Sequence, residues 1–333
     1  MRCAACGQHA TVQARRTAMS EVATMTVDFT RETEKHRHEL RVHCYRMLGS
    51  FDEAEDLVQE TFLRAWRGRD TFQGRSSFRA WLYRIATNAC LDAIDRRPAS
   101  TVVAPEMPTV EVPWLQPFPD ALLDESAEPD AEVVARETIE LAFLAAVQHL
   151  PAKQRAVLVL RDVLGWRASE TADLLDDTVP AVNSALQRAR VTLRKHLPER
   201  RADWSADPSA EEKAVVKRFV EAHEQGDLSA LAAVLREDAL WAMPPQPEWH
   251  RGRDTLIGIW MPMVAGPEAW GEWKLVVTSA NRQPAVANYV KRPGSDVFEP
   301  VALDVLRVEG DQVAEILTFP ADMFARFGLP ATC

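Results

Sequence analysis

The chain has 333 residues, which is long enough for two or three domains, each with a core of its own. Its formal net charge of -10 argues against a protein that coats nucleic acid indiscriminately, although a local basic patch still permits sequence-specific binding. Five scattered cysteines exclude a disulfide framework, and no apolar run approaches the ~20 residues that span a bilayer. The chain also starts without the apolar core of a signal peptide, so we expect a cytoplasmic protein that does not contact a membrane.

Residues 1–28 show little periodicity and are expected to form a disordered extension. Cys3, Cys6 and His9 have the spacing of three zinc ligands, but no fourth ligand is near. We therefore expect neither a metal nor another cofactor. Met19 is an alternative start, which leaves open whether residues 1–18 are translated.

A first helical block covers residues 29–97. Between residues 52 and 69, apolar side chains recur on one helical face, whereas Asp56, Gln59 and Glu60 lie on the other. This acidic face is either solvated surface or a surface that docks another protein.

The end of this block, from residue 71 to 97, places aromatic side chains among arginines. Bases can stack on aromatic rings while guanidinium groups hold phosphate, so the pattern suits single-stranded nucleic acid. Trp81, in contrast, is better explained as part of a core. The polar loop at residues 73–77 has no such structural explanation.

A linker rich in proline and acidic residues follows at residues 98–131, and its prolines favour extended structure. Residues 132–201 are helical again and end in a predicted helix-turn-helix. Its second helix, residues 178–196, has an apolar stripe, a basic opposite face and Thr178 as a plausible N-cap. That arrangement places one helix in the major groove of DNA, whereas the alternative is an ordinary helical hairpin with a solvated basic face.

The last block begins with a helical pattern at residues 210–236 and continues with four strand-like runs, at residues 274–279, 285–291, 300–308 and 312–319. Helices followed by strands indicate an α+β domain. The block contains five tryptophans, which line an apolar ligand pocket or simply form a core. They are Trp241, Trp249, Trp260, Trp270 and Trp273.

The chain resembles the extracytoplasmic-function sigma factors of bacterial RNA polymerase in three ordered motifs: DLVQETFLRAW, FQGRSSFRAWLYRIATNACLD and LPAKQRAVLVLRDVLGWRASETADLLDDTVPAVNSALQRARVTLRKHL. The resemblance implies a multidomain protein with two all-α domains. Residues 29–97 would be the sigma-2 helical bundle, and residues 132–201 the sigma-4 helix-turn-helix domain. The resemblance implies two partners, core RNA polymerase and promoter DNA. The polymerase would be contacted through the clamp helices of its largest subunit and through its flap.

The resemblance also implies roles for individual residues. Asp56, Gln59 and Glu60 would dock on the clamp helices. The residues expected at the −10 element, where a flipped base is captured, are Arg75, Ser76, Ser77, Phe78, Arg79, Trp81, Arg84, Thr87 and Asn88. The residues expected at the −35 element are Asn183, Ser184, Gln187, Arg188 and Arg190. Many relatives have arginine where this chain has Asn183, so the preferred −35 sequence stays open.

Residues 210–327 resemble a SnoaL-like domain of the NTF2 and ketosteroid-isomerase type, a cone-shaped α+β fold, in the pattern FVEAHEQGDLSAL followed by WAMPPQPEWHRGRD. We expect this domain to regulate the sigma module, with a small apolar ligand as an option. Two alternatives remain. One is isomerase- or hydrolase-like activity, for which Asp254, Asp304, His250 and Tyr289 are available residue types. The other is a helix-turn-helix regulator that does not act as a sigma subunit.

Overall fold

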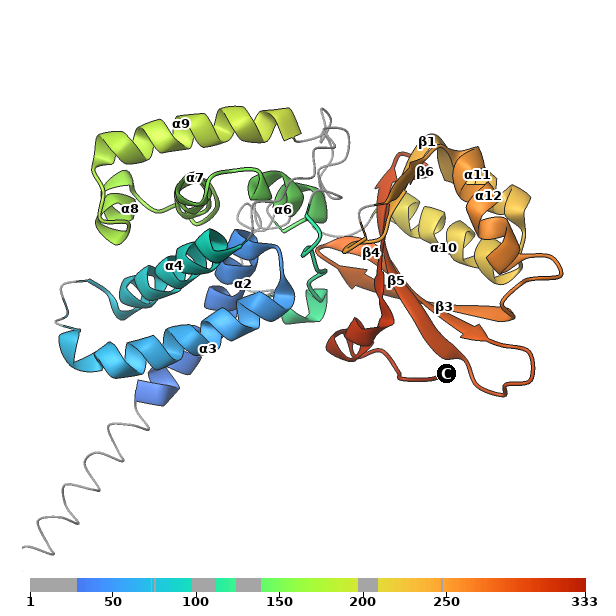
Figure 1. Ribbon diagram of the computed structural model, residues 1–333, viewed down its shortest axis with the longest axis horizontal. Coiled ribbons are helices and arrows are strands. Elements are labelled where there is room, and N and C mark those ends of the chain that lie inside the picture. Colours follow the sequence, from blue (N-terminus) through green and yellow to red (C-terminus); the bar gives the residue numbers. More distant parts are fainter. Residues whose placement is uncertain are drawn as a thin grey trace, which may run out of the picture.

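The computed structural model describes residues 29–72, 74, 76–97, 112–123, 139–196, 209–246 and 248–333. Helices occupy one side of the molecule and a sheet with its own helices occupies the other (Figure 1). The expected extension at residues 1–28 lies outside the described residues, as do most of the predicted linker and Arg75.

The first helical unit contains α2 (Arg37–Leu48), α3 (Phe51–Gly68) and α4 (Phe78–Arg96). Serine side chains cap two of these helices. Ser50 accepts a hydrogen bond from the Glu53 amide at 3.3 Å, and Ser77 accepts one from the Ala80 amide at 3.1 Å. The apolar stripe predicted for α3 turns inward, so the acidic face of that helix is left at the surface.

The second helical unit ends in the predicted helix-turn-helix. It contains α6 (Leu141–Gln148), α7 (Ala152–Leu158), a π-helical segment (Val159–Val163), α8 (Ala168–Leu174) and α9 (Val179–His196). Thr178 caps α9 as predicted, because its hydroxyl accepts a hydrogen bond from the Ala181 amide at 3.3 Å. The stripe of Val182, Leu186 and Ala189 is buried, which leaves the basic face of α9 outside.

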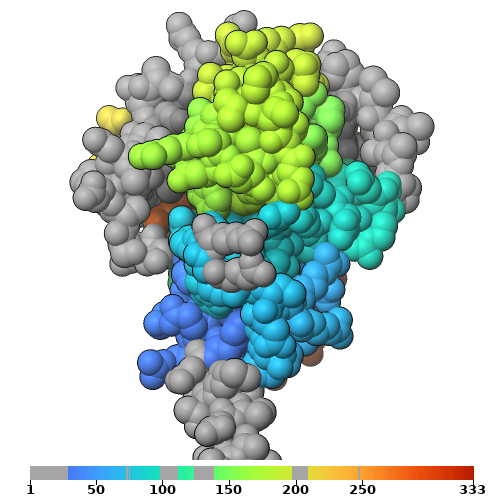
Figure 2. All heavy atoms as spheres, turned by 90° about the vertical axis from the view of Figure 1, so that its left-hand side faces the viewer, coloured from blue at the N-terminus to red at the C-terminus, as the bar shows by residue number. Residues whose placement is uncertain are grey.

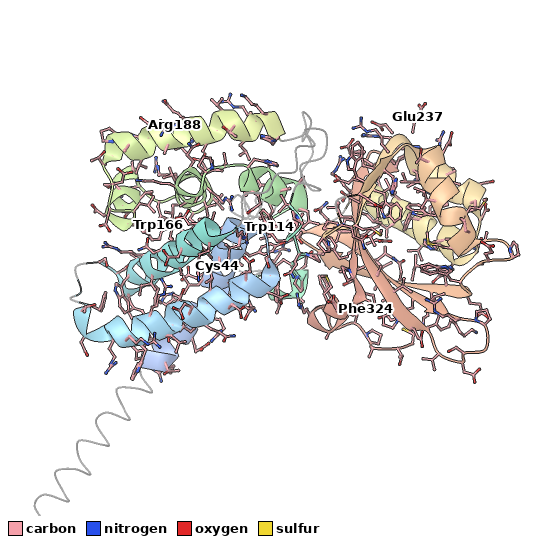
Figure 3. All side chains as sticks on the ribbon, viewed as in Figure 1. Cys44, Trp114, Trp166, Arg188, Glu237 and Phe324 are labelled. Atoms are coloured by element: carbon pink, nitrogen blue, oxygen red, sulfur yellow. The ribbon has the colours of Figure 1, made fainter. Side chains whose placement is uncertain are left out.

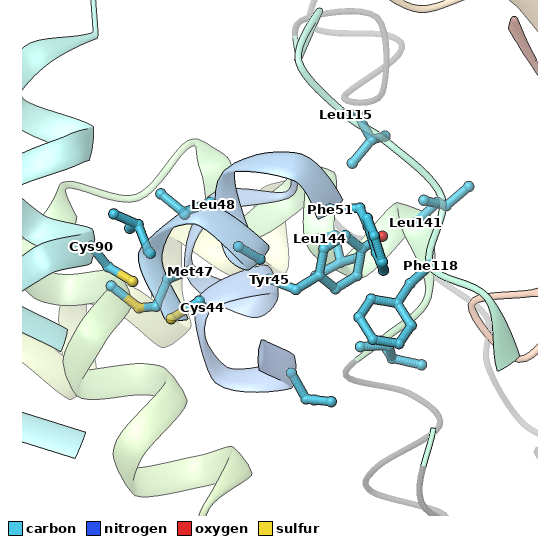
Figure 4. Packing of buried hydrophobic residues seen from close by; sticks show 14 of the residues in the cluster. Cys44, Tyr45, Met47, Leu48, Phe51, Cys90, Leu115, Phe118, Leu141 and Leu144 are labelled. Atoms are coloured by element: carbon cyan, nitrogen blue, oxygen red, sulfur yellow. The ribbon is translucent and has the colours of Figure 1, made fainter. Parts of the chain in front are cut away.

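The described part of the predicted linker, residues 112–123, departs from the expected extended tether. Val112, Leu115 and Phe118 are almost completely buried, and Phe118 packs on the rings of Tyr45 and Phe51 (Figure 4). The prolines do prevent a long helix here, and only a short 3-10 turn forms at Asp120–Leu122. The apolar side chains between the prolines are nevertheless enough to draw the segment into the core.

The C-terminal unit is an α+β domain. Its helices are α10 (Ala210–Glu224), α11 (Leu228–Val234) and α12 (Arg253–Val264). Its strands are β1 (Leu235–Ala242), β2 (Trp249–Arg251), β3 (Glu272–Ala280), β4 (Gln283–Lys291), β5 (Glu299–Glu309) and β6 (Gln312–Pro320). They form one sheet in the order β2-β1-β6-β5-β4-β3, in which only the β1–β6 pair is parallel. The four predicted strands are confirmed, whereas β1 and β2 were not predicted. The helical pattern expected at residues 210–236 ends at Val234, and β1 begins at the next residue.

The two faces of this sheet pack against different partners. Side chains such as Val286 and Leu306 pack with α10, α11 and α12. Their neighbours along the strands, such as Ala287 and Val305, belong to the large cluster that also contains the core of the first helical unit and part of the second. The rest of the second unit has a smaller core of its own around α9. Among the described residues, no helix is both long and apolar enough to cross a membrane.

Candidate nucleic-acid interface and ligand cavity

Helix α9 presents the polar face that was predicted to read the −35 element. All five candidate side chains on it are exposed: Asn183, Ser184, Gln187, Arg188 and Arg190. Arg188 lies on α9 (Figure 3), and its side chain is exposed. Arg190 donates two hydrogen bonds to the Asp162 carboxylate at 2.7 and 2.8 Å, which orients its guanidinium group along the helix surface. The face combines amide, hydroxyl and guanidinium groups, which are the donors and acceptors that base edges in the major groove require.

The candidate −10 residues lie at the start of α4 and along one side of it. Ser76, Ser77 and Asn88 are exposed. Phe78 and Trp81 are half-buried in an aromatic cluster with Phe29 and Phe72, with ring centroids 5.1 to 5.8 Å apart. The cluster leaves part of each ring at the surface, where a base can stack.

Thr87 does not belong to this surface. It is completely buried, and its hydroxyl shares a hydrogen bond of 2.9 Å with Nε2 of His43 in α2. Thr87 lies on the side of α4 that packs against α2, whereas Asn88, one residue later, is exposed. The prediction that Thr87 faces promoter DNA is therefore wrong for this conformation.

The arginines of α4 contact the second helical unit. Arg84 donates from Nη2 to both carboxylate oxygens of Asp176, at 2.6 and 2.7 Å. Asp176 sits in the turn between α8 and α9 with a left-handed φ of 50°. Arg79 pairs with Glu39 at 2.6 Å and lies 6.0 Å from the ring of Trp166 in the second helical unit. In the space-filling view, the atoms of the helix-turn-helix lie directly on those of α4 (Figure 2).

The acidic face of α3 is at the surface. Asp56 and Gln59 are exposed, and the side chain of Glu60 is 38 % exposed. Arg64 donates a hydrogen bond to Glu60 at 2.8 Å, which lowers the pKa of that carboxyl below its ordinary value. Glu60 therefore carries its charge at neutral pH, and the face is suited to a basic protein surface.

The tip of the β3–β4 hairpin binds the helical units. Asn281, which is completely buried, makes three side-chain hydrogen bonds to other units. Its Nδ2 donates to the Tyr45 hydroxyl at 2.8 Å and to the Ile139 carbonyl at 2.6 Å, and its Oδ1 accepts from the Phe118 amide at 2.7 Å. The next residue, Arg282, donates its amide to the Asp120 carboxylate at 2.7 Å. One hairpin thus connects both helical units and the segment between them.

The C-terminal domain contains a cavity of about 350 Å³ between its helices and the concave side of the sheet. Four of the five tryptophans identified in the sequence line it: Trp241, Trp260, Trp270 and Trp273. Of the four residue types considered for catalysis, Asp304 lines the cavity. Asp254 is 98 % exposed, and the Tyr289 hydroxyl donates to the Pro330 carbonyl at 2.8 Å. His250 is not among the residues that line the cavity, so the four side chains do not form one site.

Asn281 and Asp176 were not found from the sequence. Both are polar residues in short turns, a position where asparagine and aspartate are ordinary, and their partners are far away in the chain. The one local signal was the pair Asn281–Arg282 between two predicted strands, which indicates a hairpin turn but not what the turn contacts.

The chain matches three protein-family models: Sigma-70 region 2 over residues 33–98, Sigma-70 region 4 over residues 140–193, and the SnoaL-like domain over residues 216–316. It is 42 % identical to the ECF RNA polymerase sigma factor SigG of Mycobacterium tuberculosis, over 91 % of this chain and 84 % of that protein. It is 29 % identical to SigJ of the same species, over 81 % of this chain and 84 % of SigJ.

The crystal structure of the extracytoplasmic-function sigma factor SigJ of Mycobacterium tuberculosis has a similar fold. The TM-score is 0.57 at 21 % identity, and the match covers 91 % of this chain and 99 % of the SigJ chain. Helical sigma domains followed by an NTF2-like α+β domain are the fold class that the sequence predicted. The chain belongs to the extracytoplasmic-function family of RNA polymerase sigma factors, in which it carries a C-terminal SnoaL-like domain.

Proposed function

We propose that this sigma factor docks on core RNA polymerase through the acidic face of α3 and reads its promoter with two separate surfaces. The exposed face of α9 reads the −35 element, and the start of α4, with its partly exposed aromatic rings and Asn88, reads the −10 element. The exposure of these side chains and their chemistry support this assignment. The chain acts by binding, without catalysing a reaction of its own.

The C-terminal domain holds the sigma module in a closed form. The observation that carries this proposal is the buried side chain of Asn281, because its three hydrogen bonds join the C-terminal domain to both helical units and to the segment between them. In the closed form, Arg84 of α4 pairs with Asp176 in the turn before α9. The pair keeps α4 against the helix-turn-helix, so that the two DNA-reading surfaces belong to one compact body. The Asn281 hairpin stabilises that body by binding both helical units at once.

Promoter-specific transcription by purified core polymerase tests this proposal. Asn281→Gly removes the three side-chain hydrogen bonds, and glycine accepts the left-handed φ of 56° without strain. We expect this variant to raise transcription several-fold by loosening the closed form. Arg282→Gly is the matched control, because it changes the same turn at a φ of 58° and keeps the amide that binds Asp120. Equal transcription by the two variants, or a loss specific to Asn281→Gly, would contradict the proposed closure.

A further inference from the structure

The cavity of the SnoaL-like domain has the size and lining of a small-molecule site. Its volume of about 350 Å³ lies within the ~300 to 1,000 Å³ that is typical of ligand pockets. Aromatic and sulfur-containing side chains from α10, α12, the sheet and the loops beside them make up much of its wall, among them Phe219, Met243, Met263 and the four tryptophans. Flat aromatic walls favour a ring-shaped apolar occupant.

Polar side chains gather on the sheet side of the cavity. Asp304, which is 7 % exposed, accepts hydrogen bonds from Thr318 at 2.5 Å and from Nδ2 of Asn288 at 2.7 Å. Trp241 in turn donates its indole N–H to the Thr318 hydroxyl at 2.8 Å. These contacts fix the carboxylate and the amide in place, so the polar end of the cavity is already organised.

Two of the polar groups in the wall lack a hydrogen-bond partner among the described residues. Oδ1 of Asn288 is buried and accepts no bond, and neither ring nitrogen of His223, which is 8 % exposed, makes one. Burial lowers the pKa of His223 to about 4, so its imidazole is neutral at pH 7. Leaving buried polar atoms unpaired is costly, and a ligand that pairs with them removes that cost.

The free acceptor determines which polar group the ligand carries. Asn288 Oδ1 and the Asp304 carboxylate are both acceptors, and the buried carboxylate has no cationic partner among the described residues. A ligand with a hydrogen-bond donor can therefore bond to the acceptors at the Asp304–Asn288 end of the cavity, whereas an anionic ligand is repelled by the Asp304 carboxylate.

We propose that the cavity binds a small ring compound that is largely apolar and carries a hydrogen-bond donor, a hydroxyl or an ammonium group, at the Asp304–Asn288 end. The ring packs among the tryptophans, and the donor bonds to Oδ1 of Asn288. This site is independent of promoter recognition, so its test does not require transcription.

Isothermal titration of the full-length protein with matched naphthalene probes tests the site. The probes are 2-naphthol, 2-naphthylmethylamine, 2-methoxynaphthalene and 2-naphthoate, which share one ring system and differ in the polar group. We expect one of the two donors to bind with 1:1 stoichiometry and at least about tenfold more tightly than the methoxy compound, and naphthoate not to bind. The stronger donor identifies the hydroxyl or the ammonium class. Equal affinity for the donors and the methoxy compound, or no binding of any probe, overturns the proposal.

Two variants localise the binding. Ala302 lines the cavity opposite Asn288 in the β4–β5 register, so Ala302→Leu fills the space beside the amide and should abolish binding of every probe. Asp304→Asn should weaken binding of the preferred donor probe about tenfold. Asp254→Asn, the same change at an exposed position of this domain, should leave the affinity for that probe unchanged. Circular dichroism shows whether each variant is folded. Unaltered donor affinity in folded Ala302→Leu and Asp304→Asn overturns the proposal, and the probe comparison on the unmodified protein stands even if a variant fails to fold.

Discussion

Arg84 and Asp176 are 92 residues apart in the chain, yet a single guanidinium nitrogen of Arg84 donates to both carboxylate oxygens of Asp176. The first residue lies on the helix that we assign to the −10 element, and the second in the turn that precedes the helix assigned to the −35 element. The contact therefore joins the two DNA-reading surfaces to each other.

Asp176→Asn tests what this contact does. Asparagine accepts the left-handed backbone of position 176 and removes only the charge. Because both side chains are largely exposed, at 46 % and 75 %, the pair contributes no more than about 1 kcal/mol. We expect up to about fivefold more transcription from a cognate promoter, measured with purified core polymerase, and little change in thermal stability. The control is Asp173→Asn, an exposed aspartate on α8. A variant no more active than this control would show that the pair does not restrain the protein.

Arg188→Ala tests the −35 surface. The side chain is exposed on α9, so truncation should not disturb the core. We expect a loss of about 1 to 3 kcal/mol in binding of the cognate −35 element, with binding to core polymerase unchanged. Fluorescence anisotropy with cognate and scrambled −35 DNA separates base recognition from phosphate contact. Weaker binding of both DNAs by the same factor would assign Arg188 to the phosphate backbone, and weaker polymerase binding would contradict the assignment altogether.

The double variant Asp56→Lys and Glu60→Lys tests the docking face. Reversing two charges on the exposed side of α3 should weaken binding to core polymerase by about tenfold or more, and more strongly at low salt. The matched control is Glu237→Lys with Asp254→Lys, which makes the same change in net charge on the C-terminal domain, where both residues are exposed. If the two double variants bind core polymerase with equal affinity, the proposal that α3 docks on the polymerase is contradicted.

The buried carboxyl of Asp304 predicts a specific pH dependence of stability. Burial raises its pKa from 3.8 to about 6, so the folded state holds the proton more tightly than the unfolded chain. The resulting stabilisation is complete below about pH 4 and is lost as the pH rises through 6. We expect Asp304→Asn to gain stability relative to the unmodified protein over this interval, by at most about 3 kcal/mol. His223 is common to both proteins and cancels in the comparison.

Urea unfolding at a series of pH values between 4.5 and 7.5 measures this difference. Asp254→Asn, whose carboxylate is exposed, should differ from the unmodified protein by a small amount that does not vary with pH. A difference for Asp304→Asn that stays flat across the interval would show that its carboxyl titrates normally.

Local sequence pattern predicted the elements that depend on local physics. The apolar stripe of α9 and its cap at Thr178 follow from helical periodicity and from capping chemistry, and strands β3 to β6 follow from valine-rich alternating runs. The exposed positions on α9 follow from the same stripe. Thr87 shows the limit of this reasoning. Its expected role came from the resemblance to sigma factors, which does not reveal that its side chain is buried in the bundle and hydrogen-bonded to His43.

The elements missed were those set by distant contacts. β1 begins directly after α11, with no turn residue to separate them, and its pairing with β6 joins residues 75 to 78 positions apart in the chain. Burial of the proline-rich segment at residues 112–123 depends on Asn281, which lies 163 residues beyond Phe118. The polar network around Asp304 likewise needs three strands to meet, which no single stretch of sequence specifies.

The hairpin tip has a consequence for how the protein opens. The three bonds of the Asn281 side chain reach three different segments, at Tyr45, Phe118 and Ile139. If one segment leaves, the buried amide and the groups on the remaining segments lose partners together, so partial release is less favourable than complete release. The transition from the closed to the open sigma factor should therefore be cooperative, with the two helical units, their connecting segment and the C-terminal domain separating in one step.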